Sequence, residues 1–156
     1  QLMDRIPHSL LIVTPQKYNQ VHEENNLNAI KAKLHNQAYI NLAKKINLPS
    51  FKIIDQFTPK TSYYRYLKNE PQIIRDIHFE TKAEDKYLSV AVGSIISRYG
   101  FLKTWEEMEK KYNMTLPKGS GDQVDIVAQA FVERYGLERL GEIAKLHFKN
   151  TEKIRV

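Results

Sequence analysis

Apolar residues recur every three or four positions along three stretches of the chain, and each stretch is predicted to be an amphipathic helix. The first runs from Leu27 to Ile46, with Asn25 or Asn26 in position to act as its N-cap. The second, which follows residue 86, has one apolar face that consists of Leu88, Val92, Ile95, Tyr99 and Leu102. The third is capped by Asp122 and stopped by Gly136. Further helical turns are expected over residues 15–22, 61–67 and 137–148.

Three other stretches have the composition or the alternation of β-strands, namely residues 9–14, 51–57 and 72–80. The middle one carries a single acid, Asp55, just before it ends. Burying a carboxylate at the end of a strand costs free energy unless a cation or a hydrogen-bond donor pairs with it. In open α/β sheets, ligands bind at the carboxyl ends of the strands. The structural alternative is a turn aspartate that accepts a backbone N–H.

A second acid, Glu84, lies at the predicted start of the long helix. Thr81 and Glu84 have the spacing of a capping box, which by itself accounts for this glutamate. Alternatively, Asp55 and Glu84 converge and offer oxygen ligands to a hard cation such as Mg²⁺. A two-metal phosphodiesterase site needs more than two protein acids, so the set is incomplete.

Composition narrows the remaining chemistry. The chain of 156 residues is long enough for one domain, and its composition, 42% apolar and 27% charged, is that of a globular protein. Its net charge of +6 favours a polyanionic partner. Cysteine is absent, which excludes thiolate chemistry and fits a cytoplasmic location. Neither an 18-residue apolar run nor a charged-then-apolar leader is present, so we expect no membrane association.

Glycine is confined to the second part of the chain, from Gly93 onward. Since the chain also lacks an initiator Met, we expect it to be the later part of a longer protein. Residues 114–121 form a predicted loop. Its two glycines, Gly119 and Gly121, could expose N–H groups to a phosphate, but no Walker spacing is present and a plain turn is the favoured account.

Three stretches together resemble the ribonuclease HIII family, the bacterial type 2 ribonucleases H. They are residues 53–57, residues 81–84 with the helical stretch 91–99, and residues 115–121. Residues 10–19, 34–38 and 145–151 are similar to the same family, in the family's order. The resemblance therefore covers nearly the whole chain.

The resemblance implies an α/β ribonuclease H-like fold, with a mixed sheet flanked by helices. It implies cleavage of the RNA strand of RNA/DNA hybrids with two Mg²⁺ or Mn²⁺ ions, in which activated water leaves 5′-phosphate and 3′-hydroxyl ends. Asp55 and Glu84 match the family's catalytic metal ligands. Further elements are implied on the substrate side, namely Lys31, His35, Asn36 and the loop Lys118, Gly119, Ser120 and Gly121. Ser120 replaces a tyrosine of ribonuclease HII, so we expect poor cleavage at single-ribonucleotide junctions.

The chain also departs from the family. The family's catalytic domain opens with a strand that carries adjacent Asp and Glu, and no Asp-Glu dipeptide occurs here. The usual N-terminal substrate domain is missing as well. Residues 1–156 are therefore expected to be a partial catalytic domain that lacks its first strands and is inactive without the rest of a monomeric parent. Open sheet edges would favour self-association of the fragment.

Two other classes of function stay open. One is a non-catalytic nucleic-acid-binding module, in which Asp55 is a turn residue and Glu84 only a cap. The other is a helical protein–protein adaptor that uses the tyrosines at 63, 64 and 66. Binding through phosphate contacts would weaken steeply with salt, whereas adaptor binding would not.

Overall fold

The computed structural model describes residues 2–154 and divides into two compact units. Unit 1 consists of residues up to 12 and residues 25–100, and unit 2 of residues 13–24 and those from 101 onward. Each unit has its own buried core, so each is described by itself. The expectation of a single partial domain stays a prediction.

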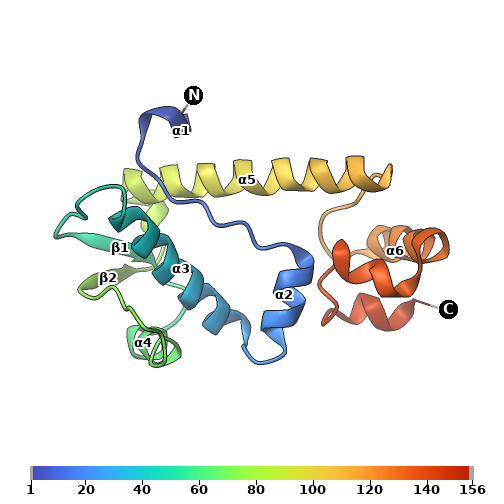
Figure 1. Ribbon diagram of the computed structural model, residues 1–156, viewed down its shortest axis with the longest axis horizontal. Helices are drawn as coiled ribbons and strands as arrows, with labels where there is room; N and C mark the ends of the chain where they lie inside the picture. Colours follow the sequence, from blue (N-terminus) through green and yellow to red (C-terminus); the bar gives the residue numbers. More distant parts are fainter. Residues whose placement is uncertain (1, 155–156) are drawn as a thin grey trace. The chain divides into compact units, whose positions relative to one another are not determined.

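Unit 1 is built around a short parallel sheet (Figure 1). Strand β1 (Lys52–Asp55) pairs with β2 (Ile77–Glu80), with Lys52 opposite Ile77 and Asp55 opposite Glu80. Helix α4 (Lys60–Tyr66) lies in the connection between them, as parallel strands require a crossover. The core of this unit consists of Ala32, Ile54, Tyr63, Leu67 and Ile77.

The first predicted helix is confirmed as α3 (Leu27–Ala43). The Asn26 side chain accepts a hydrogen bond from the backbone N–H of Ala29 at 2.9 Å, which satisfies one of the free donors at the helix start. The mixed α/β class is confirmed too. The short helix α1 (Leu2–Arg5) also belongs to unit 1.

The middle predicted strand forms over Lys52–Asp55 as β1, and the other two predicted strands are wrong in whole or in part. Residues 9–14 form no strand, because their β-rich composition finds no neighbouring strand to pair with among the described residues. The third predicted strand is shortened to β2. Before it, the Asn36 side chain bonds the backbone of Gln72 and Ile74, and Asp76 has a left-handed φ of 56°. The Asn36 side chain thus bonds the backbone groups of residues 72–74 that a neighbouring strand would otherwise pair with.

The predicted capping box is also wrong. Glu84 lies in a single 3₁₀ turn, η1 (Ala83–Asp85), which follows Lys82 in a left-handed conformation with φ 55° and has no side-chain cap. The long helix α5 (Leu88–Tyr112) begins only after this turn. The acid therefore precedes the helix and does not cap it.

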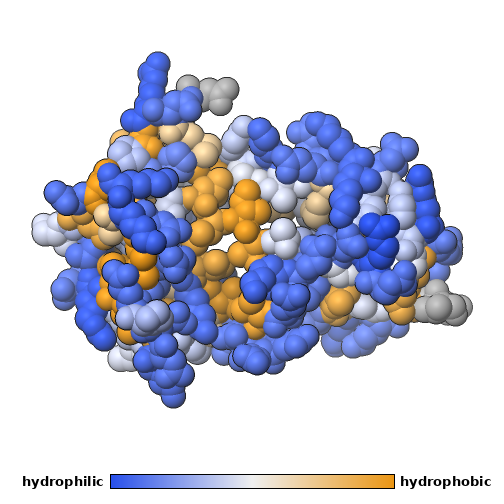
Figure 2. All heavy atoms as spheres, viewed as in Figure 1, coloured by the Kyte–Doolittle hydropathy of each residue, from blue (hydrophilic) through white to orange (hydrophobic). Residues whose placement is uncertain are grey.

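The apolar face of α5 that the pattern predicts to be buried is open in unit 1. Leu88 is 81% exposed and Ile95 59%, whereas Ile96 beside it is buried. Figure 2 shows apolar residues, in orange, open to view on the face of the molecule that it draws. The described part of unit 1 does not cover the face that an amphipathic helix would bury.

Unit 2 contains α2 (Pro15–His22), the later part of α5, α6 (Asp122–Tyr135) and the 3₁₀ segments η2 (Leu137–Glu142) and η3 (Lys149–Lys153). Gly121, not Asp122, is the N-cap of α6, and Gly136 ends it with φ 90°. The buried core consists of Tyr112, Ala128, Phe131, Val132 and Leu140. None of the helices in residues 2–154 is long and apolar enough to cross a membrane.

The predicted last helix over residues 137–148 is wrong. Only a 3₁₀ segment forms, because the Asn19 side chain of α2 bonds the backbone of this region. Its amide N–H₂ donates to the carbonyls of Gly141 and Ala144, and its oxygen accepts from Leu146 N–H. These contacts satisfy backbone groups that an α-helix would otherwise pair internally.

Candidate active site at the end of strand β1

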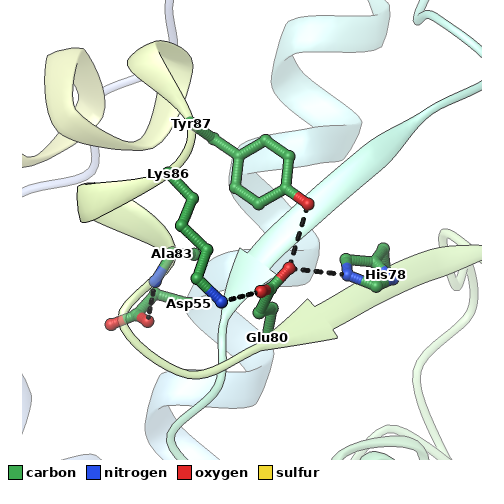
Figure 3. A network of polar contacts seen from close by, with 6 residues as sticks. All are labelled: Asp55, His78, Glu80, Ala83, Lys86 and Tyr87. Atoms are coloured by element: carbon green, nitrogen blue, oxygen red, sulfur yellow. Dashed lines mark hydrogen bonds and ion pairs between the residues drawn. The ribbon is translucent and has the colours of Figure 1, made fainter.

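Asp55 is the last residue of β1, and its carboxylate holds the next acidic segment against the end of the strand. One oxygen, Oδ1, accepts a hydrogen bond from the backbone N–H of Ala83 at 3.0 Å (Figure 3). Ala83 is completely buried and begins η1. The contact is the backbone-accepting role of a turn aspartate, made across 28 residues of sequence.

Two exposed carboxylates follow this contact directly. Glu84 and Asp85 are the second and third residues of η1, one and two positions after the residue bonded to Asp55. The turn therefore brings three acids to one end of β1. Asp85 was missed by the sequence analysis, although its place beside Glu84 in the printed sequence was a usable signal.

Glu80, the partner of Asp55 in the strand register, is held by three other side chains. Its carboxylate accepts from the Tyr87 hydroxyl at 2.9 Å, contacts His78 Nε2 at 3.0 Å and forms an ion pair with Lys86 (Figure 3). Hydrogen bonds from Lys86, His78 and Tyr87, in that order, lower the pKa of Glu80 to about 2. Since both oxygens are engaged, this acid joins β2 to the start of α5 and was not anticipated from the alternation of the strand.

Helix α3 adds two basic side chains near the same strand end. The Lys31 Nζ atom lies 5.5 Å from the centroid of the Phe57 ring, and the His35 ring lies 5.2 Å from it. Burial and, less strongly, the charge of Lys31 lower the pKa of His35, while Asp55 acts in the opposite direction. Lys31 is exposed and His35 half-buried, and both side chains lie against Phe57, two residues after Asp55.

Asn36 is placed differently from these two residues. It is 3% exposed, its amide donates to the Gln72 carbonyl at 2.8 Å, and its oxygen accepts from Ile74 N–H at 2.9 Å. Both ends of the side chain are thus used within the fold. The substrate-side role implied for Asn36 stays a prediction, since in this structure its amide substitutes for strand pairing.

The loop residues Lys118, Gly119 and Ser120 lie in unit 2. The Lys118 Nζ atom is 5.1 Å from the Trp105 ring centroid, Gly119 has φ 109°, and the Ser120 carbonyl accepts from Asn150. Loop and helix α6 follow one another as predicted. The Asp122 side chain is not the cap.

The donor set suits a divalent metal in kind but falls short in number. Carboxylate oxygens are the ligands that Mg²⁺ and Mn²⁺ prefer. Within residues 2–154, however, no three His, Asp or Glu side chains are arranged to hold one metal ion. Asp55 and the η1 acids therefore form part of a metal site at most.

Solved structures define the class of this fold. Bst-RNase HIII, solved in complex with Mn²⁺, superposes with a TM-score of 0.94 at 39% identity, over 97% of this chain and 50% of that one. An RNase H3 from Aquifex aeolicus gives a TM-score of 0.60 at 28% identity, over 85% of this chain and 46% of that one. The chain has a ribonuclease H-like fold.

Sequence comparisons identify the family. The model of the ribonuclease HII family matches residues 1–151, and the chain belongs to that family. It is 46% identical to a ribonuclease HIII of Bacillus cereus and 47% identical to one of Listeria monocytogenes, each over 98% of its length. The chain spans about half the length of these curated relatives, 50% and 51%. The resemblance to ribonuclease HIII is thereby confirmed.

Proposed function

We propose that this chain is the carboxyl-terminal part of an endoribonuclease that cleaves the RNA strand of RNA/DNA hybrids and leaves 5′-phosphate and 3′-hydroxyl ends. The contact between Asp55 and Ala83 N–H carries the proposal, because it sets Glu84 and Asp85 beside the end of β1. The relatives named ribonuclease HIII and the Mn²⁺ complex of one of them support it.

In this proposal Asp55 and Glu84 are ligands of Mg²⁺ or Mn²⁺, which when bound would stabilise charge on the phosphate and activate water. Asp55 is oriented by Ala83 N–H, so its second oxygen can be directed toward a cation. Lys31 and His35 contact the nucleic-acid backbone as cations or hydrogen-bond donors. The loop of Lys118, Gly119 and Ser120 contributes a further phosphate contact.

Activity is proposed to require the remaining half of the full-length protein. The described residues supply too few metal ligands, and the chain covers half of its relatives. The exposed apolar face of α5 fits the same picture, because Leu88 and Ile95 need a cover that unit 1 does not provide. We therefore propose that the rest of the parent chain, and not a second copy, packs on this face and completes the site.

The activity is tested on a labelled RNA/DNA hybrid with Mg²⁺ or Mn²⁺. The chain is assayed alone and mixed with the part of the Bacillus cereus relative that it does not match. Cleavage in the mixture only, abolished by Asp55→Asn and retained by Asp76→Asn, is the expected result. Asp76 is a suitable control, because its left-handed backbone favours Asn equally. Metal-dependent cleavage by the chain alone would contradict the need for a second half.

Glu84→Gln and Asp85→Asn are assayed in the same mixture. The proposal expects the loss of activity at Glu84 to exceed that at Asp85. The reverse order would assign the ligand to Asp85 and correct the site by one residue, since both acids lie in the same turn.

The proposal that the rest of the parent chain packs on the exposed apolar face of α5 is tested by Ile95→Lys, with Ile126→Lys as the control. Both isoleucines are well exposed, at 59% and 70%, so neither change disturbs a core. Binding of the complementary half, measured by calorimetry, should be lost for Ile95→Lys and kept for Ile126→Lys. Sedimentation of the chain alone distinguishes a second copy: a dimer that Ile95→Lys dissociates would assign the face to self-association instead.

A non-catalytic nucleic-acid-binding module is the second candidate. Two observations favour it: the turn role of Asp55 is fulfilled by Ala83 N–H, and the net charge is +6. The binding-module hypothesis predicts that hybrid binding weakens steeply with salt and is unchanged by Asp55→Asn. The burial of Tyr63 in the core of unit 1, against which Tyr64 and Tyr66 pack, speaks against the adaptor hypothesis.

A further inference from the structure

Asn150 of η3 joins the loop of residues 118–121 to the first turn of α6. Its Nδ2 group donates to the Ser120 carbonyl at 3.1 Å and also bonds Asp125 Oδ1. Lys153, one turn further along η3, forms an ion pair with the other oxygen, Oδ2, at 2.5 Å. One amide and one ammonium group thus hold the carboxylate of Asp125, and the same amide holds the end of the loop.

The beginning of the same loop region is fixed independently. Leu116 is 5% exposed, its N–H donates to Glu109 Oε1 at 2.8 Å, and its carbonyl accepts from Trp105 Nε1 at 2.9 Å. Both contacts come from α5. Residues 117–119 lie between these two fixed points, and Gly119 among them has a φ of 109° that glycine adopts without strain.

From this geometry we infer that Asn150 is a positioning residue, which fixes the loop of Lys118 and Ser120 in the conformation that receives the phosphates of the nucleic acid. The inference rests on the function proposed above, since it deepens the role of the substrate-side loop. Fixing a loop before binding removes the entropy that ordering it would cost in the complex. Asn150 itself needs no contact with the substrate.

Electrostatics give the contacts a second effect on the loop. Asp125 lies in the first turn of α6, four residues after Gly121, where its charge would repel a phosphate at the loop. Hydrogen bonds from Lys153 and Asn150 lower the pKa of Asp125, so it stays ionised, and Lys153 compensates its charge. Lys153 therefore offsets the negative charge of Asp125 beside the loop, on which Lys118 is an exposed cation.

The test compares Asn150→Ala with Gln129→Ala, which deletes a half-buried amide of α6 that bonds Glu133 in the same unit. The first readout needs no substrate: amide hydrogen exchange of Gly119 to Gly121 and the fluorescence of Trp105, which is the single tryptophan of the chain. Asn150→Ala should speed exchange by about tenfold, as expected for one lost hydrogen bond. Gln129→Ala should leave both signals unchanged.

The second readout is hybrid affinity and cleavage in the chain completed with the other half of the Bacillus cereus relative. Asn150→Ala should raise Kd and KM by about tenfold with kcat little changed, because it alters binding and not chemistry. Asn150→Gln, which restores the donor, should recover part of the loss. Lys153→Ala should weaken binding mainly at low salt, through the uncompensated Asp125.

The outcomes separate the two proposals. Unchanged exchange in Asn150→Ala overturns the inference, whatever the nuclease assay gives. Faster exchange with unchanged hybrid affinity overturns it too, because the loop would then be ordered by Asn150 without any effect on binding. If the wild-type protein binds no hybrid while Asn150→Ala still speeds exchange, the proposed function fails. Asn150 is then a purely structural contact.

Discussion

The hydroxyl group of Tyr39 forms hydrogen bonds with both backbone groups of Ile53, on the edge of β1 that faces away from β2. It accepts from Ile53 N–H at 3.0 Å and donates to the Ile53 carbonyl at 2.7 Å. Gln56 N–H bonds Glu80 on β2, so alternate residues of the strand, Ile53 and Asp55, direct their backbone groups away from β2. The edge expected to be open is therefore blocked at Ile53 by a side chain from α3.

Tyr39→Phe removes this block without changing the ring. We expect the free energy of unfolding to fall by about 1–2 kcal/mol, because two half-buried backbone groups lose their partner. We also expect more self-association, since the freed edge can pair with another chain. Chemical denaturation and sedimentation measure the two effects. Equal stability and an unchanged sedimentation coefficient would contradict the capping role.

Asn36→Ala is expected to destabilise unit 1 more than any exposed amide deletion. It leaves the Gln72 carbonyl and Ile74 N–H without their partner, at a cost of about 2–3 kcal/mol. Gln37→Ala on the same helix is the control, because Gln37 is exposed and bonds only Asn41 among the described contacts. Urea unfolding of both variants measures the difference. Equal losses in the free energy of unfolding would show that the hydrogen bonds from Asn36 to residues 72–74 contribute little.

Glu80 should contribute to stability against acid. Its pKa is lowered from 4.5 to about 2 in the folded state, so its contribution is complete above pH 4.5 and is lost as the pH falls toward 2. Glu80→Gln should therefore lower Tm at pH 7 and converge with the wild type near pH 2. Tyr87→Phe, which removes one donor of three, should show the same trend with a smaller amplitude. Parallel Tm curves for Glu80→Gln and wild type over this range would contradict it.

His147 makes unit 2 sensitive to acid as well, but nearer to neutral pH. Its ring lies 4.2 Å from that of His22 and 5.5 Å from Tyr18, over which Lys145 is placed at 4.3 Å. Burial first, then His22 and Lys145, lower the pKa of His147 below 6.5. Its neutral form is thus favoured by folding, and stability is complete above pH 6.5 and declines as the pH falls below that value.

His147→Phe keeps an aromatic ring against Tyr18 and removes the proton-binding site. We expect its Tm to change less than that of the wild type between pH 7.5 and pH 5, a difference that thermal scans in both buffers would detect. A wild-type Tm that is flat over this range, or an equal slope in His147→Phe, would assign the ring cluster no part in pH dependence.

The sequence alone determined the amphipathic helices, because their period is a local property of the chain. An asparagine cap of α3 at residue 25 or 26, Gly136 as the end of α6 and the acid at the end of β1 were all predicted from neighbouring residues. The family resemblance, carried by short stretches in a fixed order, supplied the ribonuclease H-like fold class and the catalytic role expected of Glu84.

Only the tertiary structure decided which groups satisfy the backbone and which faces are buried. Asn36, Asn19 and Tyr39 bond backbone groups 14 to 127 residues away in sequence and thereby shorten a strand, interrupt a helix and cap an edge. Ala83 N–H meets Asp55 across 28 residues, which no local pattern reveals. The exposed face of α5 follows the same rule: periodicity identifies an apolar face, but a partner elsewhere in space decides whether that face is covered.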